Sequence, residues 1–166
     1  MPVEPHGLAV GPGKGQELRS PLGGDVTFLV RGQHSDGALT ALEVQNPPGE
    51  GPPLHVHARE DETVYVLAGE LRFKLGDELR TAPVGSFVFI PRGLPHTWQV
   101  VGRDEGRMLV TFAPAGMERF FERLSHMSSF DPDEFRSAAA ESGMEVVGPP
   151  LAESDPLRAT GTSPPR

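Results

Sequence analysis

Three histidines and one glutamate are the residues of this chain whose types and spacing best suit metal chemistry. His55 and His57 are separated by one residue, and on a β-strand that spacing places both imidazoles on the same face. Taken alone, such a pair is more often two ordinary polar side chains than two metal ligands. Two further residues make metal binding the better interpretation. Glu62 begins the next apolar stretch, and His96 follows a turn after a later apolar stretch.

Glu62 adds a geometric requirement to the pair. It lies five residues after His57, an odd separation that would place it on the opposite face if one strand ran straight through. We therefore expect the polar segment 58–61 to turn the chain. A carboxylate that heads an otherwise apolar strand needs a partner, because an unpaired buried carboxylate is very costly, and a metal is one such partner. We interpret residues 59–61 as a solvated charge run.

The chain has no cysteine, so a metal has to be held by histidine and carboxylate. We predict that His55, His57, Glu62 and His96 hold one divalent ion. Ligand type admits Ni, Fe, Mn, Co, Cu or Zn. Four protein ligands would close a tetrahedral zinc site, whereas an octahedral ion keeps two positions for a chelating substrate and for dioxygen or water.

Short apolar runs separated by turn residues dominate the middle of the chain. Glycine (20 residues) and proline (18) make up over a fifth of the sequence, which favours many short strands. Turn residues such as Gly76-Asp77 and Gly102 separate the runs. This pattern predicts an all-β sandwich or barrel. The expected strands are residues 26–30, 39–44, 54–57, 63–68, 71–75, 86–90, 97–101 and 108–112.

The two ends of the chain differ from this middle part. We expect an N-terminal arm over residues 1–24, either flexible or with an edge strand at 8–10, and a barrel over 25–114. An extension over 115–151 should hold two short helices, the first with an apolar face and the second capped by Asp131 before Pro132. Residues 152–166 are almost without apolar side chains and are predicted to be disordered. The apolar face of the first helix is formed by Met117, Phe120, Phe121, Leu124 and Met127.

Length, composition and charge limit the kinds of molecule that this protein could bind. A length of 166 residues with 37% hydrophobic residues fits one domain with one core. The net charge of −8 disfavours nucleic acid and anionic membranes, and no apolar run reaches the roughly 20 residues of a membrane span. We therefore expect a soluble, cytoplasmic protein that binds a small molecule. A homodimer is also expected, because short open barrels have strand edges to cover.

The two histidine-containing segments resemble the paired motifs of the cupins, G-x5-H-x-H-x4-E-x6-G and G-x5-P-x-G-x2-H-x3-N. Only the final Asn departs, being Val100 here, and that position is not a metal ligand in the family. The resemblance implies a double-stranded β-helix, the jelly-roll barrel of the cupins, with the four residues named above as ligands. The matching positions are Gly49, His55, His57, Glu62, Gly69, Gly85, Pro91, Gly93 and His96.

A narrower resemblance, over about residues 25–151, is to single-domain cupins related to microbial flavonol (quercetin) 2,3-dioxygenases. It rests on stretches such as PPLHVHAREDETVYVLAGEL from Pro52 and FVFIPRGLPHTW from Phe87. It implies a metal-dependent dioxygenase of a flavonol-like or other enolizable aromatic compound, in which Glu62 takes the proton of the substrate hydroxyl. Two alternatives stay open: a non-oxidative isomerase or cyclase of polyketide-like substrates, and a small-molecule-binding cupin without catalysis.

Strand alternation suggests which side chains line the pocket. Counting by twos from Glu62 and from His96 places four apolar residues on their faces, and further large side chains on neighbouring strands are candidates. An apolar pocket beside one metal suits a flat aromatic ligand. The predicted lining is Val64, Val66, Phe73, Phe89, Trp98, Val100, Met108 and Phe112.

Overall fold

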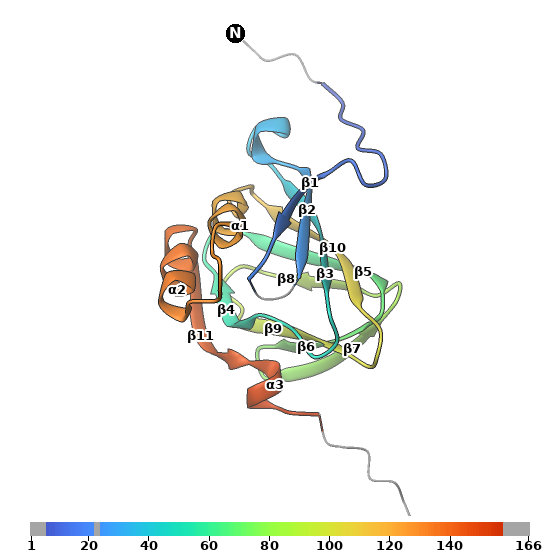
Figure 1. Ribbon diagram of the computed structural model, residues 1–166, viewed down its shortest axis with the longest axis vertical. Helices are drawn as coiled ribbons and strands as arrows, with labels where there is room; N and C mark the ends of the chain where they lie inside the picture. The colour runs from blue at the N-terminus through green and yellow to red at the C-terminus, as the bar shows by residue number, and fades with distance from the viewer. Residues whose placement is uncertain (1–5, 22–23, 158–166) are drawn as a thin grey trace, which may run out of the picture.

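Two antiparallel β-sheets face each other and enclose the core of the molecule (Figure 1). The structure is a computed structural model that describes residues 6–21 and 24–157. The first sheet has six strands, in the order β1 (Gln16–Arg19), β2 (Asp25–Val30), β3 (Thr40–Asn46), β10 (Gly106–Ala113), β5 (Asp61–Ala68) and β8 (Phe87–Ile90). The second has five, in the order β11 (Met144–Pro150), β4 (Pro53–His57), β9 (His96–Val101), β6 (Glu70–Leu75) and β7 (Glu78–Pro83).

Strand alternation explains how the core forms between the sheets. On β5, Glu62, Val64 and Val66 are buried and point inward, whereas Tyr65 is exposed on the outer face. The register of β5 with β10 pairs Val64 with Val110, so apolar side chains meet across the strands. Glu62 is a polar residue near the start of β5. Because its side chain points to the same side as those of Val64 and Val66, it lies inside the barrel.

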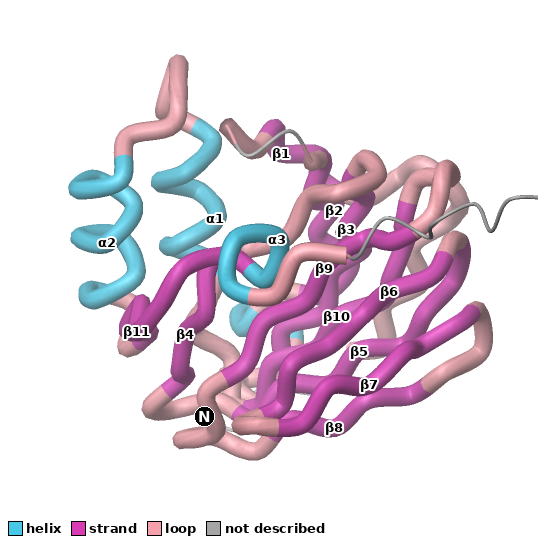
Figure 2. The backbone as a smooth tube through the Cα atoms, turned by 90° about the horizontal axis from the view of Figure 1, so that it is seen from below, coloured by secondary structure: helices cyan, strands magenta, loops and turns pink. Residues whose placement is uncertain are grey.

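Two helices, α1 (Glu118–Ser125) and α2 (Pro132–Glu141), lie side by side at one side of the barrel, with α2 next to β11 (Figures 1 and 2). Two shorter helices, η1 (Gly32–His34) and α3 (Leu151–Ser154), follow β2 and β11. The ring centroids of Phe120 on α1 and Phe135 on α2 lie 5.3 Å apart, and both side chains are buried. The side chain of Asp131 accepts hydrogen bonds from the backbone N–H groups of Asp133 and Glu134, as the predicted cap requires.

The all-β double-stranded β-helix expected from the sequence is confirmed, and so are all eight predicted strands, with ends shifted by one or two residues. Two strands at sheet edges were missed, β7 and β11. β7 is mostly exposed and polar, and β11 ends in two prolines, which edge strands tolerate.

The termini need further correction. Residues 8–10 form no strand, and the strand of the arm is instead β1, which pairs with β2. A third helix, α3, begins at Leu151, whose buried side chain anchors it, so the start of the predicted disordered tail is helical. The remaining arm and tail predictions for residues 1–5 and 158–166 lie outside the described residues. Within the described residues no helix is long and apolar enough to cross a membrane.

Candidate metal centre

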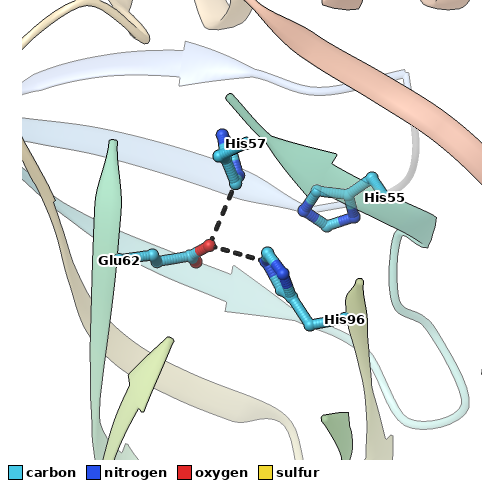
Figure 3. A group of neighbouring side chains, drawn as sticks. All are labelled: His55, His57, Glu62 and His96. Atoms are coloured by element: carbon cyan, nitrogen blue, oxygen red, sulfur yellow. Dashed lines mark hydrogen bonds and ion pairs between the residues drawn. The ribbon is translucent and has the colours of Figure 1, made fainter. Parts of the chain in front are cut away.

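Three strands from both sheets bring the predicted ligands together inside the barrel (Figure 3). His55 and His57 lie on β4, and their ring centroids are 5.1 Å apart. His96 begins β9 and is the direct partner of His55 in the β4–β9 register. Glu62 comes from β5 in the opposite sheet, so the site joins the two sheets across the core.

The ligand atoms of these residues converge on one point. Nε2 of His96 lies 2.9 Å from Oε2 of Glu62, and Nε2 of His57 lies 3.4 Å from the same oxygen. One ligand atom from each of the four residues lies within 4.8 Å of the others, and all four side chains are buried. The sequence-predicted set is thus assembled in full.

The predicted turn between His57 and Glu62 is present, and backbone hydrogen bonds hold it in place. The N–H of Ala58 donates to the carbonyl of Gly143 at 2.9 Å, and the carbonyl of His57 accepts from Gly93 at 2.8 Å. The prediction that residues 59–61 form a solvated run is wrong for one member. Glu60 is only 2% exposed and faces His57 from the side away from Glu62.

Hydrogen bonds on the far ring nitrogens orient two of the histidines. Nδ1 of His55 lies 2.7 Å from the carbonyl of Pro53, and Nδ1 of His96 lies 2.9 Å from the carbonyl of Leu94. A carbonyl only accepts, so Nδ1 carries the proton in both rings. Their Nε2 atoms therefore face the cluster with a free lone pair in the neutral form, which is the state that binds a metal.

Charge inside the cluster shifts the pKa values in opposite directions. Burial, helped by the neighbouring rings of His96 and His57, lowers the pKa of His55 to about 3, so this ring is neutral. Burial disfavours the charged form of His57 too, but the carboxylates of Glu60 and Glu62 outweigh it and raise the pKa to about 9. Burial opposes ionisation of Glu62, yet hydrogen bonds from His57 and His96 hold its pKa far below its usual range.

These residues fit a divalent metal ion. Three imidazoles and one carboxylate, all buried and aimed at one another, form a donor set that suits first-row transition metals. The carboxylate of Glu62 contacts two of the imidazoles through the same oxygen, Oε2, which lies 3.4 Å from Nε2 of His57 and 2.9 Å from Nε2 of His96. The residues that could hold the ion are His55, His57, Glu62 and His96.

An apolar cavity of about 90 Å³ adjoins three of the four residues, His55, His57 and Glu62. Its wall includes Trp98 and Phe112, and the ring of Phe112 lies 5.3 Å from that of His57. Polar atoms are few. Asn46, at the end of β3, is 7% exposed, and its Oδ1 has no hydrogen-bond partner among the described residues. The cavity thus combines a metal-binding end with apolar walls and a buried amide.

The predicted pocket residues fall into three groups. Trp98 and Phe112 line the cavity, whereas another five lie in the barrel core without reaching it. Phe89 is placed wrongly by the prediction, because it is 55% exposed on the outer face of β8. Its register partner is Thr63, which also faces outward, so β8 directs Ile90 inward instead. The five core residues are Val64, Val66, Phe73, Val100 and Met108.

Sequence reasoning missed much of the cavity wall, including the part that comes from the helical extension. The apolar face of α1 was expected to pack on the barrel, and the structure shows that it closes the cavity beside the metal-binding end. The signal was present in the amphipathic pattern, but the pattern does not show which part of the barrel the helix covers. The cavity-lining residues that follow β10 are Met117, Phe120, Phe121 and Leu124 at and along α1, Phe135 on α2 and Met144 on β11.

Comparison with known proteins agrees with this architecture. Residues 42–112 match the Cupin_2 family, described as a cupin domain. The chain is 28% identical to quercetin 2,3-dioxygenase of Bacillus subtilis (strain 168) over 74 residues, 45% of this chain and 22% of that protein. It is also 28% identical to protein SchB of Streptomyces halstedii over 123 residues, 72% of this chain and 86% of that protein.

The match to the dioxygenase spans only about a fifth of that relative's length. Among solved structures, KdgF from Halomonas sp. has the same fold, with a TM-score of 0.59, 20% identity, and coverage of 66% of this chain and 94% of that one. The matched family segment contains all four ligand candidates and five of the strands that surround them, β4, β5, β6, β8 and β9. The segment that carries the histidine–glutamate cluster therefore matches a cupin domain, and the barrel has the double-stranded β-helix fold.

Proposed function

We propose that this protein is a metal-dependent dioxygenase that acts on a flavonol-like or other enolizable aromatic small molecule. The observation that carries the proposal is a buried cluster of three histidines and one glutamate that opens onto an apolar cavity. The similarity to quercetin 2,3-dioxygenase over 74 residues supports the same class of reaction. A bound divalent ion would supply Lewis acidity toward a substrate oxygen and, if redox-active, a route for reaction with dioxygen.

Glu62 is the residue that we assign as base. Its carboxylate is ionised at neutral pH, because hydrogen bonds from His57 and His96 keep its pKa low. It lines the cavity, so a substrate hydroxyl in the cavity comes within its reach. Removal of that proton yields the enolate, which is the electron-rich form that reacts with oxygen.

The cavity indicates a compact, mostly apolar substrate. At the roughly 30 Å³ that a water molecule takes in the liquid, a volume of about 90 Å³ corresponds to about three waters. Aromatic side chains such as Trp98 and Phe121 suit the faces of a flat ring system. The unpartnered Oδ1 of Asn46 supplies an acceptor for one hydroxyl of the substrate.

The test is a substrate screen with the metal-loaded protein in the presence and absence of oxygen. We expect uptake of dioxygen with a flavonol or a smaller enolizable aromatic compound, with both atoms of ¹⁸O₂ in the products. Turnover that continues without oxygen would instead identify a non-oxidative isomerase or cyclase. Tight binding without turnover under any metal would identify a small-molecule-binding protein.

We also propose a homodimer. The exposed aromatic side chains of Tyr65, Phe87 and Phe89 lie together on the outer face of β5 and the edge strand β8. A two-fold contact would bury this patch against its own copy. Replacing Phe87 and Phe89 by Ser should yield a monomer in analytical ultracentrifugation, and a dimer that persists at the same concentration would rule out this interface.

A further inference from the structure

Glu60 is a buried carboxylate that the proposed reaction does not use. It is 2% exposed, and its Oε2 lies 3.7 Å from Nδ1 of His57. Neither of these two atoms has a hydrogen-bond partner among the described residues, although both are shielded from solvent. A buried polar atom without a hydrogen bond is costly, so the retention of this carboxylate beside His57 calls for a function.

The three histidines differ in what faces their Nδ1 atoms. For His55 and His96 the acceptor is a backbone carbonyl two residues earlier in the chain. For His57 the facing group is the carboxylate of Glu60, three residues later. His57 is thus the one ring of the cluster whose orientation depends on another side chain.

The space for this carboxylate is built by a second segment of the chain. Gly116, which lies between β10 and α1, approaches Glu60 so closely that a Cβ at position 116 would lie 3.0 Å from Oε1. A side chain at this position would have to displace the carboxylate. Glycine here leaves the room in which Glu60 faces His57.

We infer that Glu60 is a positioning residue of the metal centre, whose carboxylate accepts the Nδ1 proton of His57 and directs Nε2 toward the ion. Charge-assisted hydrogen bonds have lengths of about 2.7–2.9 Å, so a shift of roughly 1 Å closes the contact. Glu60 is not a further ligand, because it lies on the Nδ1 side of the ring whose Nε2 faces Glu62. The inference rests on the proposed metal centre and is independent of the reaction catalysed there.

Cobalt(II) titration of the metal-free full-length protein tests this role. Glu60→Ala should weaken Co²⁺ binding about 10- to 100-fold, the usual cost of losing such a partner. Glu60→Gln keeps an acceptor oxygen and should restore most of the affinity. Glu70→Gln, which removes one exposed carboxylate from β6, is the matched control and should leave the Kd within twofold. Wild-type affinity in Glu60→Ala would overturn the inference.

A double-mutant cycle shows whether Glu60 acts through His57. In a His57→Ala background, Glu60→Ala should change the Co²⁺ affinity by less than about twofold, and a further tenfold loss would contradict the inference. Circular dichroism checks that each variant is folded. If Glu60→Ala is unfolded, Gly116→Ala crowds the carboxylate instead and should weaken binding several-fold, whereas unchanged binding would count against the inference.

The same titration separates the two proposals. If the wild-type protein binds no Co²⁺, the proposed metal centre fails and the role of Glu60 fails with it. If the wild type binds Co²⁺ and Glu60→Ala binds it equally well, only the role of Glu60 is overturned.

Discussion

Proton release on metal binding follows directly from the charges in the cluster. The carboxylates of Glu60 and Glu62 raise the pKa of His57 to about 9, so at pH 7 this ring carries a second proton in the metal-free protein. His55, with a pKa of about 3, is already neutral. A metal ion has to displace the extra proton of His57 before Nε2 can bind it.

The magnitude follows from this linkage. Metal binding displaces one proton from His57. Below the pKa of His57, the affinity for a metal should therefore increase about tenfold for each unit by which the pH is raised, or about 100-fold from pH 6 to pH 8. Isothermal titration calorimetry with Zn²⁺ at pH 7, in buffers of different ionisation enthalpy, should detect the release of about one proton from this ring. A Zn²⁺ affinity that stays constant from pH 6 to pH 8, without proton release, would refute the reasoning.

The raised pKa of His57 should also make the stability of the metal-free protein depend on pH. A histidine whose pKa is higher in the folded than in the unfolded state stabilises the fold at low pH, and its contribution is lost as pH rises through the folded value. The metal-free protein should therefore lose stability between about pH 6.5 and 9, by about 3 kcal/mol at most from His57. The Zn²⁺-loaded protein should not show this loss, because its His57 ring is neutral throughout this range.

Three further changes probe the base, the cavity and the fold. Glu62→Gln should keep some bound metal and abolish turnover, measured by oxygen uptake; unchanged turnover would refute the base role. Asn46→Leu should raise the free energy of unfolding by about 1 kcal/mol and weaken substrate binding several-fold, because Oδ1 has no hydrogen-bond partner among residues 6–21 and 24–157; substrate affinity at the wild-type level would show that this amide is not used. Glu118→Gln should cost about 1 kcal/mol at pH 7, because the carboxylate accepts a hydrogen bond from Gly32 at 2.6 Å. The pKa of Glu118 is lowered in spite of partial burial, so this cost should begin to decrease in urea titrations as the pH falls below the ordinary value of 4.5, and a cost that is the same at pH 3 as at pH 7 would contradict the assignment.

The sequence predicted the ligand set because each ligand sits where a local rule applies. His55 and His57 obey strand alternation, and the odd spacing to Glu62 required the turn that the structure shows between β4 and β5. Polar residues at the boundaries of apolar strands are recognisable one by one. Their convergence was an expectation from the motif and became visible only with the two sheets in place.

Glu60 shows why the rest was out of reach. In the sequence it is one of four consecutive charged residues, a pattern typical of a solvated turn. Its burial depends on Gly116 and on the ring of His57, which come from different segments of the fold. No local pattern reports such contacts.

Phe89 and the α1 face illustrate a second limit. Four apolar residues in a row on β8 carry no alternation, so only pairing with β5 decides which of them point inward. The apolar face of α1 was evident, but its position over the cavity depends on the whole path of the chain after β10. The register of two strands and the position of a helix on the barrel depend on residues far apart in the sequence. No short segment of the sequence therefore predicts them.

We propose that His55, His57, Glu62 and His96 together form one metal centre. Elemental analysis of the purified protein, beside a His96→Ala variant of equal folded content, tests it most directly. We predict about one divalent transition-metal ion per wild-type chain and a loss of most of that metal in the variant. A wild-type protein that neither contains nor takes up such an ion, or a variant that keeps full occupancy, would contradict the account.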